Sequence, residues 1–287
     1  MSVYGDPTGQ TLIADAPPSW LAGLLDLGRP LVMGILNCTP DSFFDGGRFV
    51  DPGNAIAQAE EMVRQGADII DIGAESTRPY GGATPVLAEE EMARLAVVLP
   101  AVIKLGRPVS IDTVKSSVAA WALDRGVTMV NDVWGLQRDP AMADVVSKAD
   151  VPVVIMHNRY KPDISVDIIE EVSAFFARSL EIATRAGIAR GCRVLDPGIG
   201  FGKTAEQSIA CIARLAEFKR FDLPLLVGAS RKRFINSITP SQPDDRLGGS
   251  IASHLEAVAN GAAIVRVHDV AETVQALRVA AALKGAR

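Results

Sequence analysis

The chain has 287 residues, of which 48% are hydrophobic and 22% charged, and its formal net charge is -5. This balance provides no basic stripe for nucleic acid, so we expect a small-molecule ligand. The length allows one large α/β domain or two small ones, and the even spread of apolar residues favours one.

Cysteine usage and the N-terminus bear on the compartment. Cys38, Cys192 and Cys211 show no paired spacing, which argues against a disulfide framework or a zinc site. The N-terminus lacks the charged and apolar regions of a signal peptide. No apolar run reaches the roughly 18 residues of a membrane helix. We therefore expect a cytoplasmic protein with no membrane partner.

Short apolar runs alternate with helical patterns along the chain. Residues 1–30 contain Pro7, Pro17 and Pro18, which predict a loosely structured lead-in that caps one end of the domain. Apolar runs too short for helices predict strands, at residues 31–36, 67–72, 109–112, 128–131, 151–157, 192–195, 223–230 and 264–268.

Helices are expected between these strands. Their predicted ranges are about 52–65, 87–105, 114–125, 140–149, 166–187, and 231–260 with interruptions near Pro240 and Pro243. Asp51 and Pro52 provide an N-cap and a first-turn proline. Another helix begins at Thr204, with Gln207 at capping-box spacing, and Asp269 with Glu272 caps the last helix.

Strand and helix alternate eight times, which indicates a parallel sheet, since parallel neighbours need a crossover helix. Eight such units in a chain of this size predict a closed (β/α)8 TIM barrel, with an open doubly wound sheet as the alternative. We expect residues 1–30 to be an N-terminal extension and residues 31–287 to form a single barrel domain.

The stretch 196–204 reads Asp-Pro-Gly-Ile-Gly-Phe-Gly-Lys-Thr, which suits an anion or heterocycle site better than a core. It is not a P-loop, because Pro197 stands where that pattern needs glycine. It also lacks the third glycine of the dinucleotide-binding fingerprint. A strand, a glycine loop and a helix remain, and an ordinary connecting loop is the alternative interpretation.

Polar residues fall at or just beyond the ends of the predicted strands. They are Asn37, Asp71, Asp112, Asn131, His157, Asp196, Ser230 and His268. In a barrel these ends form one rim, where barrel enzymes hold their chemistry. His157 is open to two interpretations, a rim residue or a satisfied core histidine. Cys38 has no partner base and is interpreted as small apolar filler.

The chemistry of the rim can be read from its residue types. Asp112, Asn131 and Asp196 are short donors and acceptors, which suit a flat heterocycle with several edge nitrogens. Positive charge comes from Arg78, Arg266, Lys232 and His268. With Asn37, these could hold a pyrophosphate and a magnesium ion that keeps most of its waters. Zinc chemistry is disfavoured, because no three His or carboxylate residues have zinc spacing.

Five segments resemble the ordered motifs of dihydropteroate synthases. They are GILNCTPDSFFDGG at 34–47, DIGAESTRP at 71–79, DPGIGFGK at 196–203, SRK at 230–232 and RVH at 266–268. The resemblance runs from about Leu31 to the C-terminus. It implies condensation of 6-hydroxymethyl-7,8-dihydropterin pyrophosphate with 4-aminobenzoate, which gives 7,8-dihydropteroate and pyrophosphate in folate biosynthesis. It also implies a homodimer through helices on one side of the barrel, and inhibition by sulfonamides.

The same resemblance implies a role for each matching residue. Asn37 would contact magnesium and pyrophosphate, with Thr77, Arg266 and His268 on the phosphates. The pterin would be held by Asp112, Asn131, Asp196 and Lys232, and Asp112, Asp196 and Lys232 are the expected catalytic residues. The aminobenzoate pocket would be shaped by Arg78, Pro79 and Ser230.

The chain departs from this pattern at Asn158-Arg159-Tyr160, where many members carry Met-Gln-Gly. This puts the covering role of that loop in question. One competing function is a barrel methyltransferase that uses a methylated folate, but the motifs around Asn37 and Arg78 argue against it. The other is a non-catalytic pterin-binding paralogue, and the retained Arg78, Lys232 and Arg266 argue against that.

Overall fold

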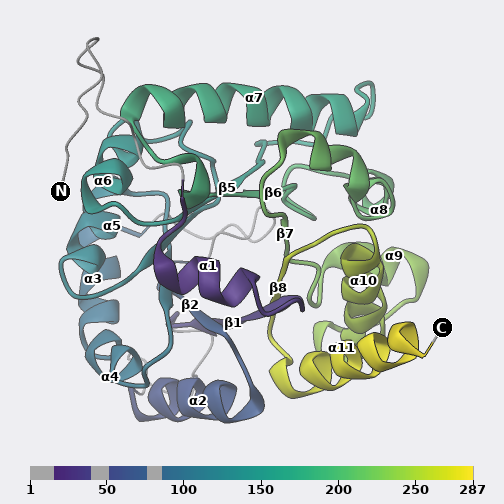
Figure 1. The fold of residues 1–287 in the computed structure, drawn as a ribbon, viewed down its shortest axis with the longest axis horizontal. Helices are drawn as coiled ribbons and strands as arrows, with labels where there is room; N and C mark the ends of the chain where they lie inside the picture. Colours follow the sequence, from purple (N-terminus) through teal and green to yellow (C-terminus); the bar gives the residue numbers. More distant parts are fainter. Residues whose placement is uncertain (1–15, 40–51, 76–85, 287) are drawn as a thin grey trace, which may run out of the picture.

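The computed structural model describes residues 16–39, 52–75 and 86–286. Its strands form one eight-stranded parallel sheet in the order β6-β5-β4-β3-β2-β1-β8-β7 (Figure 1). They are β1 (Leu31–Asn37), β2 (Ile69–Gly73), β3 (Val109–Asp112), β4 (Met129–Asp132), β5 (Val153–Met156), β6 (Arg193–Asp196), β7 (Leu226–Val227) and β8 (Ile264–Val267). A parallel bridge between Leu195 and Leu225 joins the two ends of this order. The predicted barrel is therefore confirmed, and the open sheet is excluded.

Helices surround the strands in Figure 1. They are α1 (Ser19–Leu25), α2 (Pro52–Gln65), α3 (Ala88–Ala96), α4 (Leu99–Ile103), α5 (Ser116–Leu123), α6 (Met142–Ala149), α7 (Ile168–Ala186), α8 (Ala205–Ala213), α9 (Arg233–Ile238), α10 (Leu247–Ala259) and α11 (Val270–Gly285). The described residues also form the 3₁₀ helices η2 (Arg190–Cys192), η3 (Leu215–Phe221) and η4 (Pro243–Arg246). The single helix predicted over 87–105 is wrong, because α3 ends at Ala96. Pro100 lies in the first turn of α4, where its missing N–H is tolerated.

Two predicted helix caps have different outcomes. The capping box at the start of α8 is confirmed, because the Thr204 hydroxyl accepts a hydrogen bond from the Gln207 N–H at 3.1 Å and the Gln207 side chain accepts one from the Thr204 N–H. The Asp269 cap of α11 is wrong, because this carboxylate pairs with Arg231 instead. The proposed Asp51 cap lies outside the described residues.

Alternate side chains of each strand face the barrel interior, and they divide into two layers. The lower layer, toward the amino-terminal ends of the strands, is apolar. It contains Leu31, Met33, Ile69, Met129, Val154, Val194, Leu226 and Ile264. Two residues further along several of these strands, the inward position is polar, as at Asp71 after Ile69 and Asn131 after Met129. The strands therefore fill one end of the barrel with hydrocarbon and present polar groups at their carboxyl ends.

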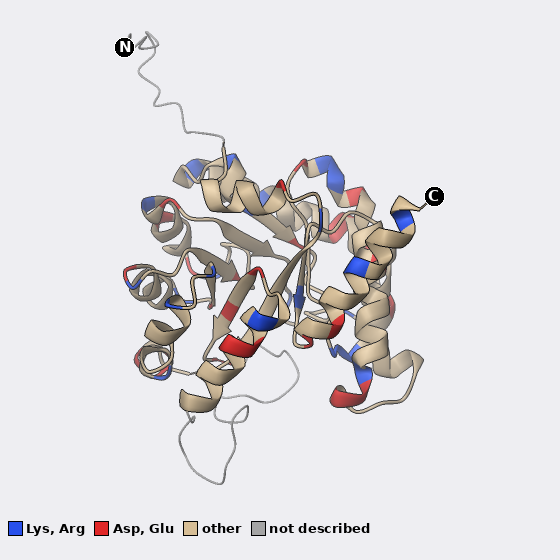
Figure 2. Cartoon of the chain, turned by 60° about the horizontal axis from the view of Figure 1, so that its bottom comes forward, with Lys and Arg blue, Asp and Glu red and all other residues tan. Residues whose placement is uncertain are grey.

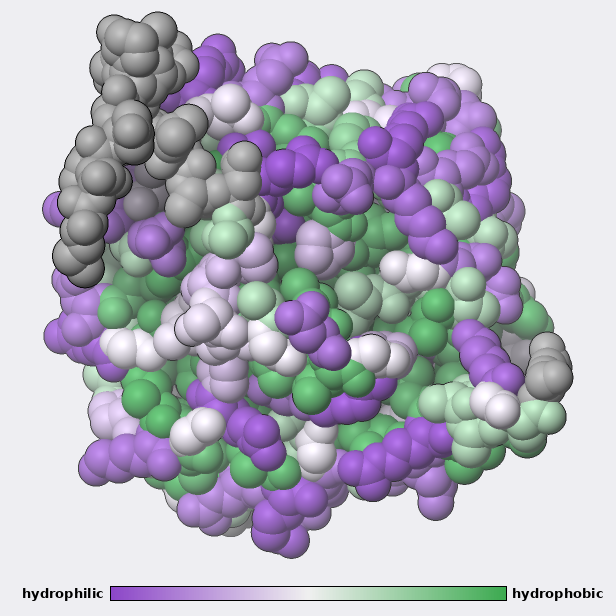
Figure 3. Space-filling view, in the orientation of Figure 1, coloured by the Kyte–Doolittle hydropathy of each residue, from purple (hydrophilic) through white to green (hydrophobic). Residues whose placement is uncertain are grey.

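Helix α1 lies across the amino-terminal end of the barrel (Figure 1). Its Leu21 is fully buried and packs with the apolar lower layer. Residues 19–25 are thus helical, where the sequence predicted a loosely structured lead-in. In Figure 3, which shows this face, hydrophilic side chains lie near the centre as well as at the periphery, mixed with weakly polar and hydrophobic ones. Because α1 and the apolar layer fill this end of the barrel, the polar layer lies at the opposite end.

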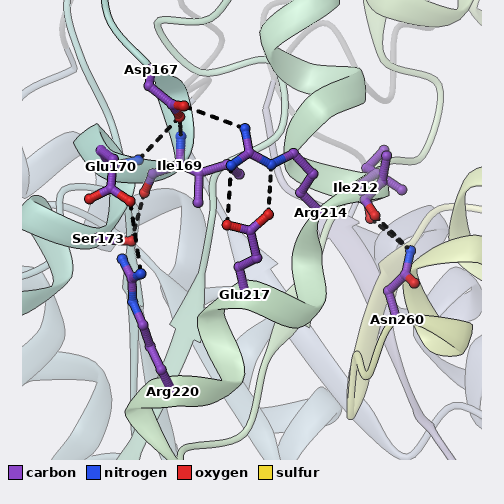
Figure 4. A network of polar contacts seen from close by, with 10 residues as sticks. Asp167, Ile169, Glu170, Ser173, Ile212, Arg214, Glu217, Arg220 and Asn260 are labelled. Carbon is purple, nitrogen blue, oxygen red and sulfur yellow. Dashed lines mark hydrogen bonds and ion pairs between the residues drawn. The ribbon is translucent and has the colours of Figure 1, made fainter.

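Polar contacts join neighbouring outer helices. Arg214 at the end of α8 lies between Asp167, the N-cap of α7, and Glu217 of η3 (Figure 4). Figure 2 shows acidic and basic residues interspersed over the outer helices. Within the described ranges, no helix is both long and apolar enough to span a bilayer. The three cysteines are buried and free.

Candidate active site

Arg266 of β8 organises the polar layer at the carboxyl ends of the strands. Its Nε donates to Asp71 Oδ2 of β2 at 2.6 Å, and its Nη2 donates to Asp112 Oδ2 of β3 at 2.8 Å. Asn131 of β4 donates from Nδ2 to the same Asp71 oxygen at 3.0 Å. Burial opposes the charge on Arg266, but the two carboxylates raise its pKa. Four strands thereby contribute to one connected polar cluster.

This cluster leaves two carboxylate oxygens available. Asp71 Oδ1 and Asp112 Oδ1 are buried and have no hydrogen-bond partner among the described residues. Burial raises the pKa of Asp112 to about 7, although Arg266 opposes this shift. Buried polar groups are normally paired. The two oxygens therefore mark acceptor positions that a ligand with N–H donors can satisfy.

Asp196 ends β6 and begins the glycine loop. Its Oδ1 accepts a hydrogen bond from the Gly198 N–H at 2.7 Å. Burial raises the pKa of Asp196 to about 6, against the opposing effects of this bond and of Lys232. Gly198 has φ +67, and a Cβ there would lie 2.0 Å from the His157 carbonyl oxygen. Glycine is required at this position so that the loop can pack against the end of β5.

Lys232 and Ser230 come from the segment that follows β7. The Lys232 Nζ lies 4.1 Å from the centroid of the Phe201 ring, a cation–π distance. The Ser230 hydroxyl lies 2.9 Å from His268 Nδ1 and accepts from the His268 N–H at 3.2 Å. Burial and Arg266 lower the pKa of His268 to about 3, so this imidazole is neutral near pH 7.

An apolar wall stands beside these polar groups. It consists of Val114, Val133, Met156 and Phe201, with Trp134 packed against it. Met156 pairs in register with Asp196, and Val114 and Val133 each follow a site residue by two positions. The carboxyl-terminal end of the barrel therefore has an apolar surface beside a row of buried hydrogen-bond donors and acceptors. A flat heterocycle needs this combination.

His157 is a core histidine in this structure. It is fully buried, its Nδ1 lies 2.6 Å from Lys203 Nζ, and its ring packs edge-on against Phe175. Burial and Lys203 lower its pKa. Its Nε2 is buried and has no hydrogen-bond partner among the described residues, so the structure supports a core histidine that is satisfied at Nδ1 alone.

Arg159 in the unusual loop after β5 has a defined position. Its Nη2 donates to the Gly202 carbonyl oxygen at 3.0 Å and to Gln207 Oε1 at 3.3 Å. Next to it, the Tyr160 ring packs against Trp134 with centroids 4.5 Å apart. The altered loop is thus joined to the glycine loop and to the apolar wall.

Of the remaining residues expected to bind substrate, the structure describes Asn37 but not those around Arg78. Asn37 is half-buried at the end of β1. Thr77, Arg78 and Pro79 lie outside the described residues. Among the described residues, no group of three or more His, Cys, Asp or Glu can hold a metal. A magnesium ion that kept its waters and bound largely through a substrate would need few protein ligands, and Asn37 would be its contact here.

The sequence shows Asp71 as a polar residue at a strand end but does not reveal its role. The structure places it at the centre of the cluster, fully buried against Arg266 and Asn131. The sequence pattern indicates this buried position, because Asp71 shares an inward face with Ile69 in an otherwise apolar strand. A carboxylate in that position needs a cationic partner.

Residues 33–268 match the family model described as pterin binding enzyme. The chain belongs to this family. It is 45% identical over 279 residues to the dihydropteroate synthase of Synechocystis sp., a match that covers 93% of this chain and 96% of the relative.

Two solved dihydropteroate synthases have the same fold. That of Clostridium difficile, solved in the presence of pteroic acid, has a TM-score of 0.85 and 48% identity and covers 89% of this chain and 97% of its own. That of Xanthomonas albilineans, solved with 4-aminobenzoic acid, has a TM-score of 0.86 and 42% identity and covers 90% and 94%. By these relationships the chain is a dihydropteroate synthase homologue over most of its length.

Proposed function

We propose that this chain condenses 6-hydroxymethyl-7,8-dihydropterin pyrophosphate with 4-aminobenzoate, a transferase reaction that yields 7,8-dihydropteroate and pyrophosphate. The observation that carries the proposal is the row of buried polar groups from Asp112, Asn131 and Asp196 beside the apolar wall. The family match gives this arrangement its ligand, a pterin.

The pterin ring would lie against the apolar wall with its polar edge toward the row. Asp112 Oδ1 lacks a partner among the described residues, and a ring N–H would supply one. Asn131 and Asp196 extend the row, and Lys232 lies over Phe201 at its edge. Hydrogen bonds to charged groups contribute about 1.5–3 kcal/mol each, so an ionised Asp112 favours binding strongly.

In the reaction, the bond between the pterin methylene carbon and the bridging pyrophosphate oxygen breaks. The electron pair leaves with the pyrophosphate, and the ring shares the positive charge that develops on the methylene carbon. Asp112 and Asp196, when ionised, stabilise that charge electrostatically. The aminobenzoate nitrogen then forms the new C–N bond and loses its proton to water. Holding the two substrates in line supplies much of the acceleration.

The leaving pyrophosphate would be held by Asn37, Thr77, Arg266 and His268. Arg266 is positively charged and fixed by two carboxylates, so its orientation is set before the substrate arrives. Magnesium, when bound, would neutralise charge on the pyrophosphate, with Asn37 as a protein ligand. Arg78, Pro79 and Ser230 would shape the aminobenzoate pocket.

The proposal is tested by measuring pyrophosphate release from the pterin pyrophosphate with magnesium, with and without 4-aminobenzoate, together with dihydropteroate formation. Equal amounts of both products, formed only with 4-aminobenzoate, are expected. A sulfonamide should compete with 4-aminobenzoate. Pterin binding without product, under conditions where a known synthase turns over, would instead indicate a non-catalytic paralogue or a folate-dependent methyltransferase.

We also propose a cytoplasmic homodimer that pairs through helices on one side of the barrel. Exposed large hydrophobic side chains on α8, α9 and α11 support the dimer, among them Ile209, Ile238 and Leu283. Three free, buried cysteines are typical of a reducing compartment. Light scattering that gives the mass of a single chain would contradict the dimer.

A further inference from the structure

One side of α10 carries three buried polar side chains that the proposed reaction does not use. They are Arg246, which immediately precedes the helix, Ser250 and His254, and they are 8%, 3% and 1% exposed. Residues four positions apart on a helix lie above one another on the same side. The spacing therefore aligns the three side chains along one buried side of α10.

Each of these side chains binds the backbone of the loop after β7. His254 Nε2 accepts a hydrogen bond from the Ala229 N–H at 3.2 Å, and Ser250 Oγ accepts one from the Arg231 N–H at 2.9 Å. Arg246 Nη1 donates to the Arg231 carbonyl oxygen at 3.0 Å. The helix therefore holds the loop through three separate hydrogen bonds, two of them on the peptide groups that flank one residue.

That residue, Arg231, has an unusual backbone conformation. Its φ is +56, in the left-handed region that non-glycine residues rarely adopt. Such a conformation persists only where the surrounding structure determines it, and it is frequent at functional sites. Arg231 lies between Ser230 and Lys232, which the proposed function assigns to the two substrates. The conformation that places these two residues is thus held from outside the loop.

The polar side of α10 also has a cost. Arg246 Nε and His254 Nδ1 are buried and have no hydrogen-bond partner among the described residues. Burial lowers the pKa of His254 to about 4, so its imidazole is neutral near pH 7, with Nε2 as the acceptor and the proton on Nδ1. An apolar side chain would avoid the unpaired group but would leave a loop N–H or carbonyl without its partner. The polar character of these positions is therefore tied to the loop.

We propose that Arg246, Ser250 and His254 are positioning residues that hold the loop after β7 in its substrate-binding conformation. The inference rests on the proposed function, which assigns Ser230 to aminobenzoate and Lys232 to the pterin. Because both residues lie on the same loop, loss of one hydrogen bond from α10 should displace them together. The effect should therefore appear in kcat/KM for both substrates.

The main test compares Ser250→Ala with Ser253→Ala in the full-length chain. Both hydroxyls donate to the carbonyl oxygen four residues earlier, that of Arg246 or of Gly249. Ser250 in addition accepts from the Arg231 N–H, so the two variants differ in this bond. We expect kcat/KM to fall on the order of tenfold for both substrates in Ser250→Ala, because a small displacement of binding groups is costly. In Ser253→Ala it should stay within about twofold of the wild type.

A second pair of variants separates the hydrogen bond of His254 from its bulk. His254→Gln retains an acceptor that can reach the Ala229 N–H and should keep most of the activity. His254→Leu fills similar space without an acceptor and should lose about tenfold in kcat/KM. If the folded leucine variant were as active as the glutamine variant, the hydrogen bond would not position the loop and the proposal would be overturned.

Hydrogen exchange at the Arg231 amide gives a readout independent of activity. It should be slow in the wild-type chain, about tenfold faster or more in Ser250→Ala, and unchanged in Ser253→Ala. Unchanged exchange or unchanged kcat/KM in folded Ser250→Ala would overturn the proposal, and so would equal losses of activity in the two serine variants. If the wild-type chain made no dihydropteroate, the proposed function would fail, while the exchange experiment would still decide whether α10 holds the loop.

Discussion

The replacement of Asp71 by asparagine tests how the polar cluster is built. Asparagine has nearly the shape of aspartate and keeps one oxygen acceptor, so the change mainly removes a charge. Asp71 Oδ2 currently accepts from Arg266 Nε at 2.6 Å and from Asn131 Nδ2 at 3.0 Å. Asp71→Asn therefore loosens two residues that are proposed to bind opposite ends of the pterin pyrophosphate.

The magnitude follows from what remains in the variant. Removing one partner of a buried ion pair costs about 3–5 kcal/mol when the other charge is left alone. Here Asp112 still accepts from Arg266 Nη2 at 2.8 Å, so the loss should approach that of one charged hydrogen bond, about 1.5–3 kcal/mol. This corresponds to a decrease in kcat/KM for the pterin pyrophosphate of roughly ten- to 150-fold.

The assay compares Asp71→Asn with Asp68→Asn, which removes a carboxylate of similar burial from a pair with Arg29. Steady-state kinetics with both substrates and thermal unfolding are measured for each variant. Both changes should lower Tm, but only Asp71→Asn should lower kcat/KM. If well-folded Asp71→Asn retained wild-type kcat/KM, Asp71 would not position Arg266 and Asn131 for the substrate.

Three further predictions concern pH, substrate specificity and stability. Burial raises the pKa values of Asp112 and Asp196 to about 7 and 6, so both carboxylates lose their charge as pH falls through this range. The kcat/KM for the pterin substrate should therefore decrease between about pH 7 and 6. Both values lie above the unfolded value of 3.8, so the folded chain binds more protons and the free energy of unfolding should fall as pH rises from about 4 to 7. Activity that stays flat from pH 8 to about 5.5, or a Tm that rises across the stability window, would contradict these assignments. Arg78→Ala should raise the KM for aminobenzoate more than that for the pterin substrate, and equal effects would remove Arg78 from the aminobenzoate pocket. Thr204→Ala removes the capping-box acceptor of α8 and should lower the free energy of unfolding by about 1 kcal/mol in denaturant titrations, whereas an unchanged value would show that the cap contributes nothing.

Most strands were predictable because a buried parallel strand is a short, continuous apolar run. β3 has the predicted bounds, but the strand expected over 223–230 shortens to Leu226–Val227. Pro224 has no N–H to donate to the sheet, and its carbonyl oxygen accepts from Leu195. The Ala229 N–H donates to His254 Nε2 instead of a neighbouring strand. Neither partner is visible in the local pattern.

The rim of the barrel was predictable for a different reason. The carboxyl ends of parallel strands meet at one edge, so Asp112, Asn131 and Asp196 could be assigned to one site from strand positions alone. Their partners could not, because Arg266 and Asp71 are 195 positions apart. The sequence showed Arg266 only as a cation near the phosphates, and its bonds to two carboxylates depend on the closure of the barrel.

The polar layer itself argues that this end of the barrel is shaped by ligand binding more than by stability. Apolar residues in place of Asp71, Asp112 and Arg266 together would continue the hydrocarbon layer that begins with Ile69 and would remove two buried oxygens that lack partners among the described residues. Buried carboxylates are costly, and a raised pKa is the measure of that cost at Asp112 and Asp196. A bound pterin would offset the cost with its own N–H donors. The least favourable part of the fold is thus the part that a ligand would stabilise most.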